Sequence, residues 1–121
     1  MDRKTQSRQM QVLGAAPEWT SGSVHAITQD GKVLIASNSG SQIPGYAYGS
    51  DHVIWVVGAQ KIVKDFDTGI ERIYEYSLPL ENERAQKAYG IGSFVSKILV
   101  FNREPKPHRT ILILVKENIG Y

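Results

Sequence analysis

The chain has 121 residues, of which 41% are hydrophobic and 21% are charged, and its net charge is +2. These values are typical of one globular domain, and so mild a charge argues against nucleic acid or an anionic membrane as a partner. No apolar run approaches the roughly 20 residues that cross a bilayer, and the N-terminal residues are too polar for a secretory signal. The absence of cysteine excludes disulfides and cysteine-ligated zinc or iron–sulfur clusters on this chain. We therefore expect a cytoplasmic protein without membrane insertion.

The first predicted elements are a helix and a hairpin. The helix covers residues 3–13 and contains few apolar side chains. Residues 23–29 and 32–37 are predicted strands, because apolar and β-branched side chains dominate both. Between them, Asp30 and Gly31 form a dipeptide that is typical of a two-residue type I′ turn.

Three later runs, residues 53–57, 98–101 and 111–115, are short and apolar on both faces. Strands of this kind are typically buried on both sides, which indicates helices over both faces of a sheet. An aspartate in place of Val56 or Ile113 would then prevent folding. The spacing of apolar residues predicts the covering helices over residues 65–77 and 81–89. Together these elements predict an α/β fold, a three-layer sandwich with a mixed, mostly parallel sheet and at least one antiparallel pairing.

The main candidate for a ligand site is a small, polar turn over residues 38–42, between a buried strand and a short helix predicted over residues 43–48. Backbone N–H groups of such a turn point into open space, and a helix N-terminus makes that space attractive to anions. The alternative is an ordinary connection in which serines cap the helix. The predicted ligand-binding residues of the turn are Asn38, Ser39, Gly40, Ser41 and Gln42.

Lys61 is a further candidate ligand-binding residue. It follows the strand predicted over residues 53–57, at the carboxyl end where open α/β sheets place ligands; the alternative is an ordinary solvated lysine. The histidines His25, His52 and His108 share no metal-ligand spacing, so no metal site is predicted. No catalytic residue is predicted either.

Four sequence blocks carry a resemblance to a known family: residues 22–28 together with Gly31, residues 36–42, residues 52–63 and residues 111–121. Together they resemble the lactate-utilization (LUD) domain family. Residues 71–85 also fit the family pattern, so the resemblance runs from Gly22 to the last residue.

The resemblance implies a fold similar to the sugar-isomerase and CoA-transferase superfold. It also implies a role in operons that oxidise L-lactate to pyruvate beside iron–sulfur proteins. Iron–sulfur clusters are therefore expected on partner proteins, and no cofactor is expected on this chain. Family members normally carry another α/β portion before the block at Gly22, and many carry a cysteine cluster that this chain lacks. We expect a helical or extended segment over residues 1–21 and the C-terminal half of a LUD-like domain over residues 22–121.

Two functions remain open. The chain is either an accessory component of L-lactate oxidation that binds a small carboxylate or phosphate at the turn, with Lys61 nearby, or a non-catalytic half-domain. In the second case an open sheet edge and an apolar sheet face would pair with another copy, as a homodimer, or with a partner chain. The expected anchors of that interface are the aromatic residues Tyr46, Tyr48, Trp55, Tyr74 and Tyr76.

Overall fold

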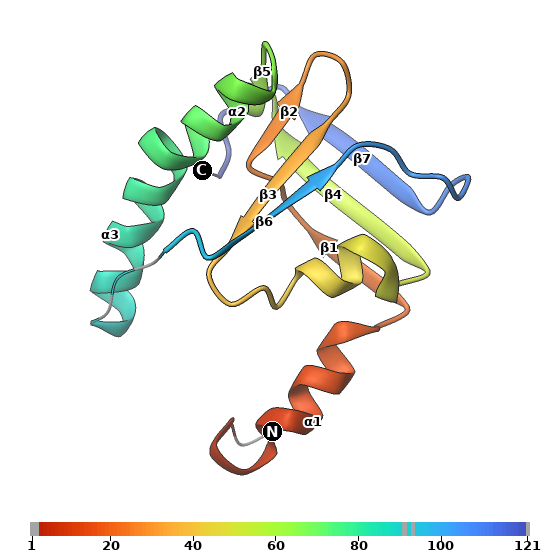
Figure 1. Cartoon of the computed structure of the whole chain (residues 1–121), viewed down its shortest axis with the longest axis vertical. Helices are drawn as coiled ribbons and strands as arrows, with labels where there is room; N and C mark the ends of the chain where they lie inside the picture. Colours follow the sequence, from red (N-terminus) through yellow and green to blue (C-terminus); the bar gives the residue numbers. More distant parts are fainter. Residues whose placement is uncertain (1–2, 91, 93, 121) are drawn as a thin grey trace.

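The computed structural model describes residues 3–90, 92 and 94–120, and their strands form two sheets (Figure 1). The first sheet is parallel and contains, in spatial order, β1 (Trp19–Gly22), β4 (His52–Gly58) and β7 (Thr110–Val115). The second sheet is mixed and contains, in spatial order, β5 (Ile62–Val63), β2 (Ala26–Thr28), β3 (Val33–Ser37) and β6 (Lys97–Phe101). Three of these five strand pairings are parallel, so the predicted mixed, mostly parallel α/β fold is confirmed.

Helices cover the outer face of the second sheet. They are α2 (Phe66–Arg72), the π-helix η3 (Ile73–Ser77) and α3 (Leu78–Tyr89), which follow one another without a break. The sequence predicts two separate helices here, on account of Pro79. The helical path nevertheless continues through Pro79, which is the second residue of α3 and directly follows the π-helix η3. Gly90 then ends α3 in the left-handed conformation, with φ 74°.

The two sheets pack face to face around Trp55 of β4. Its ring meets Tyr46 and Phe101 edge-on, with centroids 5.4 Å and 5.2 Å away. Trp55 and Tyr46 are only 1% and 3% exposed, so their predicted role as interface anchors is wrong. Tyr48, Tyr74 and Tyr76 are exposed. The other buried members of this sheet–sheet cluster are Val24, Val33, Ile35, Val53 and Val57.

A second apolar cluster joins the second sheet to the helices. Leu34 and Ala36 of β3 point to the opposite face from Val33 and Ile35, and they pack against Ile73 of η3. The molecule therefore has three layers, in the order helices, second sheet, first sheet (Figure 1).

The outer face of the first sheet has no helix over it in the described part of the chain. Val56 is 41% exposed, and Ile111 and Ile113 are 49% and 47% exposed. The prediction that helices cover both faces of residues 53–57 and 111–115 is therefore wrong, because the second sheet covers one face and the other is open. We call the outward side of these strands, with Trp19, Val56, Ile111 and Ile113, the open face.

The predicted hairpin between β2 and β3 is confirmed, but its turn differs. The N–H of Thr28 donates to the carbonyl of Lys32 at 2.8 Å, which leaves a loop over residues 29–31. A type I′ turn would need positive φ at Asp30 as well as at Gly31. Gly31 has φ 95°, but among the described residues other than glycine only His108 has positive φ. Asp30 therefore does not meet this requirement, and the turn is not of type I′.

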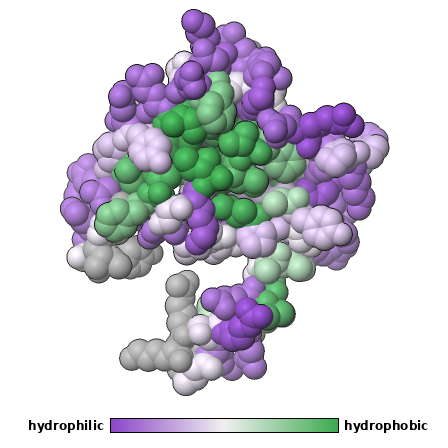
Figure 2. Space-filling model, viewed as in Figure 1, coloured by the Kyte–Doolittle hydropathy of each residue, from purple (hydrophilic) through white to green (hydrophobic). Residues whose placement is uncertain are grey.

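The N-terminal helix α1 (Arg3–Ala15) extends the helix predicted over residues 3–13 and projects away from the sheets (Figure 1). Its surface is mostly hydrophilic, while apolar groups gather on the body (Figure 2). The end of α1 lies against η1 (Gly45–Gly49), the π-helix found where residues 43–48 are predicted to be helical. A Cβ on Gly49 would lie 2.1 Å from the carbonyl oxygen of Ala15, so only glycine permits this contact. Among the described residues, no helix has the length and apolar character needed to span a membrane.

Candidate functional site

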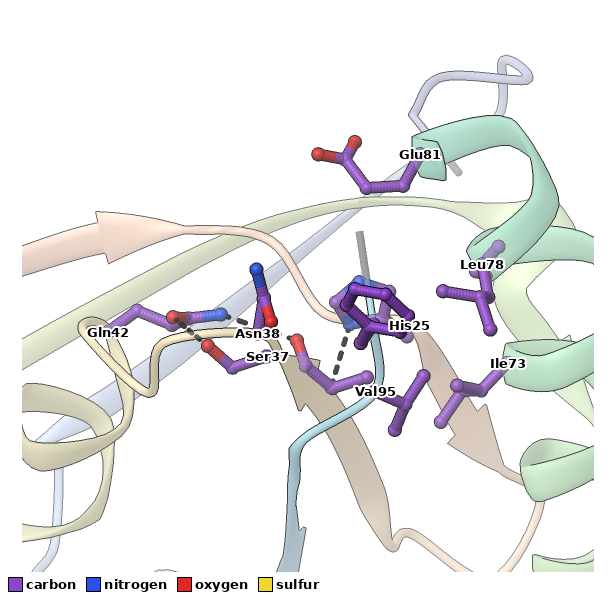
Figure 3. A pocket seen from close by; sticks show the side chains of 11 residues that line it. His25, Ser37, Asn38, Gln42, Ile73, Leu78, Glu81 and Val95 are labelled. Atoms are coloured by element: carbon purple, nitrogen blue, oxygen red, sulfur yellow. Dashed lines mark hydrogen bonds between the residues drawn. The ribbon is translucent and has the colours of Figure 1, made fainter. Parts of the chain in front are cut away.

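A pocket of about 200 Å³ lies beside the turn that follows β3, between the second sheet and the helices (Figure 3). We call it the turn pocket. Its polar lining comes from His25, Ser37, Asn38, Gln42, Ser77 and Glu81. Its apolar lining comes from Ala36, Ile73, Leu78, Phe94 and Val95.

Ser37 and Gln42 fix the shape of the turn. The Ser37 hydroxyl donates to Gln42 Oε1 at 2.8 Å and accepts the N–H of Gly40 at 2.8 Å. Gln42 Nε2 donates in turn to the carbonyl of Ala36 at 3.4 Å. Gly40 has φ 86°, a conformation that other residues rarely adopt, so glycine is required at this position.

Asn38 presents a donor to the pocket. Its Oδ1 accepts a hydrogen bond from the Ser96 hydroxyl at 3.1 Å. This contact fixes the amide so that Nδ2 points away from β3, on the side where Glu81 lies (Figure 3). The two Nδ2 protons are then available to a ligand.

His25 contributes a neutral N–H donor. Its Nδ1 accepts the backbone N–H of Ala36 at 3.0 Å, so its proton resides on Nε2. Burial, and after it the charges of Lys61 and Arg72, lower the pKa of His25 to about 4, against a smaller opposite effect of Glu81. The imidazole is therefore uncharged at neutral pH. Sequence reasoning considered His25 only as a metal ligand. It missed the donor role because that role depends on a hydrogen bond from the backbone of Ala36, eleven residues away.

The charges around the pocket favour an anion. The Arg72 guanidinium donates to the carbonyl of His25 at 2.8 Å and to the Ser77 hydroxyl at 2.9 Å. Glu81 is the one carboxylate among the lining residues, and its pKa is lowered chiefly by the hydrogen bond from Arg84. Arg84 thus balances Glu81, and the guanidinium of Arg72 adds positive charge beside the pocket, where it acts on His25.

The structure brings together only part of the predicted ligand-binding set. Asn38 and Gln42 line the turn pocket, whereas Ser39, Gly40 and Ser41 belong to the turn but not to the lining. The carbonyl of Ser39 accepts a hydrogen bond from Lys97 Nζ at 2.9 Å. No residue of η1 lines the pocket, so a helix N-terminus does not contribute to it.

Lys61 lies outside the turn pocket. It is only 3% exposed, and its ammonium donates to the carbonyl of Val24 at 2.8 Å and to the Ser23 hydroxyl at 3.1 Å. Burial lowers the pKa of Lys61 to about 8, and the charge of Arg72 contributes. Its charge nevertheless reaches the pocket, since it depresses the pKa of His25.

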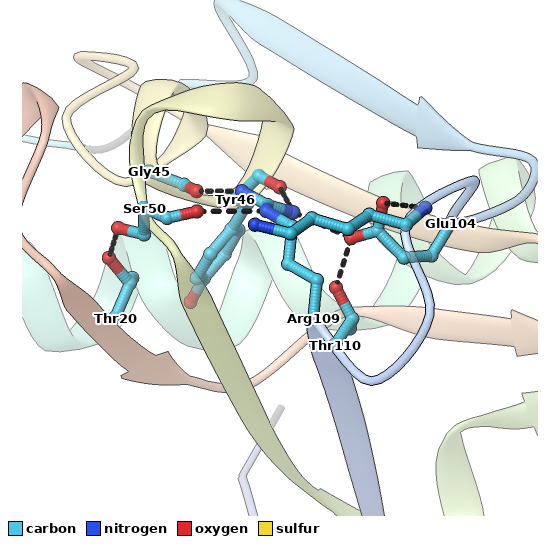
Figure 4. A network of polar contacts seen from close by, with 8 residues as sticks. Thr20, Gly45, Tyr46, Ser50, Glu104, Arg109 and Thr110 are labelled. Atoms are coloured by element: carbon cyan, nitrogen blue, oxygen red, sulfur yellow. Dashed lines mark hydrogen bonds and ion pairs between the residues drawn. The ribbon is translucent and has the colours of Figure 1, made fainter.

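A second polar cluster surrounds Arg109 and is structural (Figure 4). The guanidinium is buried and donates to the carbonyls of Gly45, Tyr46 and Ser50 at 2.8–3.0 Å. Glu104 pairs with it at 2.7 Å. Arg109 thus satisfies carbonyl groups at and beside η1 and ties that helix to the start of β7. Within the described residues, no group of three or more histidine, aspartate or glutamate side chains is placed to hold a metal.

The family model for the LUD domain matches residues 20–115. The chain belongs to the LUD domain family. No curated protein and no solved structure matches it. The matched residues contain both sheets, apart from the first residue of β1, and the whole turn pocket, whereas α1 precedes them. The LUD domain relates this chain to lactate-utilization proteins in general.

Proposed function

We propose that this LUD domain is an accessory component of L-lactate oxidation to pyruvate and binds a small carboxylate or phosphate ligand in the turn pocket. The observation that carries the proposal is the convergence of Asn38 and Gln42, from the predicted turn, with the neutral His25, whose backbone carbonyl accepts a hydrogen bond from Arg72. Iron–sulfur proteins of the same pathway would be its partners, and they would carry the electrons.

The donors of the pocket suit a carboxylate. Nδ2 of Asn38 and Nε2–H of His25 would donate to its oxygens, and the nearby positive charge of Arg72 would favour its negative charge. Glu81, at the helical side, would accept a hydrogen bond from a ligand hydroxyl. The pocket, of about 200 Å³, is large enough for a three-carbon acid.

Titration of the ¹⁵N-labelled chain with L-lactate, pyruvate and phosphate tests this proposal. We expect the first shifts at the amides of Asn38, Gly40 and Gln42, and an affinity loss of roughly tenfold in Asn38→Ala, as one lost hydrogen bond to a charged group implies. Asn102→Ala removes an equally exposed amide far from the pocket and is the matched control. Shifts confined to residues 105–108, or equal affinities of both variants, would contradict the proposal.

The second candidate function is self-association through the open face. The exposed aliphatic groups of Val56, Ile111 and Ile113 favour it, because a contiguous apolar surface usually marks an interface. A second copy is the partner we propose, since an uncharged apolar face can oppose itself without repulsion. Sedimentation equilibrium should give a dimer that Ile113→Ser weakens, with Lys106→Ser as the exposed control. A monomer at all concentrations would contradict it.

A further inference from the structure

The three parallel strands of the first sheet end close together, at an edge that the turn pocket does not include. β1 leads into Ser23, β4 leads into Gln60 and Lys61, and β7 leads into residues 116–120. The carboxyl edge of parallel strands is where open α/β sheets bind ligands. The side chains at this edge are therefore candidates for ligand binding.

Lys61 at this edge is a buried cation without a counterion. Its two acceptors, the carbonyl of Val24 and the hydroxyl of Ser23, are both uncharged, and no described carboxylate forms an ion pair with it. The charge that bears on it most is Arg72, another cation. A buried charge normally has an opposite partner, because removing it from water is costly. An ammonium also has three N–H donors, and Lys61 uses two of them.

Gln60 beside it has an acceptor without a partner. Its Nε2 donates to the carbonyl of Ile119 at 2.6 Å, whereas its Oε1 is buried and accepts no hydrogen bond. Gly58 permits this position, since a Cβ there would lie 2.1 Å from Gln60 Oε1. The edge thus holds a cation and an amide that the protein does not satisfy.

The C-terminal segment, residues 116–120, lies over these groups. A Cβ on Gly120 would lie 2.9 Å from Lys61 Nζ, so the backbone of the segment passes directly beside the ammonium. The segment has no helix or strand and its side chains are exposed. A segment with so few buried contacts opens at low free-energy cost.

We propose that Lys61, Ser23 and Gln60 form a second binding site, for a small oxyanion of the carboxylate or phosphate type, and that residues 116–120 close it and move aside when the anion enters. The anion would receive the third N–H of Lys61 and the hydroxyl proton of Ser23. Nε2 of Gln60, released from Ile119, would also donate to it, and the unpartnered Oε1 of Gln60 would accept the hydroxyl proton of lactate or hydrogen phosphate. It would supply the counter-charge that the buried ammonium lacks.

Titration with inorganic phosphate and, separately, with L-lactate tests the site by NMR. We expect shifts of the Lys61 side-chain Cε and of the amides of Gln60, Ile119 and Gly120, together with faster motion of residues 117–120. Lys61→Met should weaken binding roughly tenfold or more, the loss of one charge-assisted hydrogen bond. Lys64→Met removes an exposed lysine three positions on and should change nothing.

Two further variants separate the parts of the proposal. Ser23→Ala removes an exposed hydroxyl and should also weaken binding. This variant tests the proposal even if Lys61→Met does not fold. A chain that stops at Lys116 should bind the anion more tightly, because no segment must be displaced. Asn38→Ala should leave these shifts unchanged, which distinguishes this site from the turn pocket. Absence of the Lys61 shift, or its persistence with full affinity in Ser23→Ala and Lys61→Met, would overturn the proposal.

Discussion

The two sheets contain similar apolar runs but differ in how these runs are covered. All five residues of β3 in the second sheet are buried, because helices cover one face and the first sheet covers the other. In β4 and β7 the residues that point away from the second sheet, such as Val56, Ile111 and Ile113, remain exposed. A run of apolar residues thus shows that both faces of a strand suit burial, but it does not show what covers them.

The largest expected effect on stability comes from placing one negative charge in the second sheet, and the same change in the first sheet should have little effect. Leu34→Asp in β3 should abolish soluble folding, because an unpaired buried carboxylate costs several kcal/mol, comparable with the stability of a small domain. Ile113→Asp, on the open face, should leave a soluble chain that melts cooperatively in circular dichroism. The expectation from sequence that aspartate at Val56 or Ile113 prevents folding is thereby withdrawn, since both positions are half exposed. Failure of Ile113→Asp to fold would mean that the open face is covered in solution.

The next effect concerns Lys61 at the carboxyl edge of the first sheet. Its pKa in the folded chain is about 8, below its ordinary value of 10.5, so the unfolded chain binds the proton more tightly. Stability should therefore rise as pH increases from about 8 towards 10, by about 3 kcal/mol at most. Urea unfolding across this range measures the slope, which Lys61→Met should remove. Above pH 10 the raised pKa of Tyr46 acts in the opposite direction.

His25, beside the second sheet, should make the stability of the chain depend on pH in the acidic range. Its pKa is about 4 in the folded chain against 6.5 ordinarily, so the unfolded chain takes up the proton first as pH falls. Stability should fall between about pH 6.5 and pH 4, by about 3 kcal/mol at most. Melting temperatures from pH 7 to pH 4.5, above the titration of most carboxylates, measure it. His25→Gln should flatten this curve, and an unchanged slope would show that the imidazole is accessible to protons.

The smallest expected effect tests the hairpin turn of the second sheet. Gly31→Ala should destabilise the chain by about 1 kcal/mol, because φ 95° is strained for any residue with a Cβ. Gly14→Ala, in α1 with no atom near its Cβ, should instead be neutral or slightly stabilising. Equal melting temperatures for both variants would mean that the turn adopts another conformation.

Local signals predicted the local structure well. The dipeptide Asp30-Gly31 marked the hairpin, and Gly90 marked the end of α3, because each residue acts through its own backbone. The existence of β4, β6 and β7 also followed from their apolar runs. Their division between two sheets did not, since β6 pairs with β3 through contacts sixty or more residues apart in the chain.

The candidate site was predictable only for the residues that one continuous segment contributes. The turn over residues 38–42 is short and polar, so its place beside a pocket followed from sequence for Asn38 and Gln42. The partner His25 and the charge of Arg72 come from other elements, and the chain order gives no sign that they meet. Lys61 was singled out for its position after a strand, but its burial depends on contacts with residues 23, 24 and 120, which are distant in sequence.

The strand order of the first sheet sets a limit on how the chain can fold. Its central strand, β4, lies between β1, from the beginning of the described chain, and β7, from its end. During synthesis β4 therefore leaves the ribosome with one neighbour only, and Trp55 has no complete core until residues 110–115 follow. Arg109, immediately before β7, then joins the late segment to η1 through three carbonyls. Folding of this kind depends on contacts distant in sequence, which form slowly and leave apolar strands exposed to aggregation in the meantime.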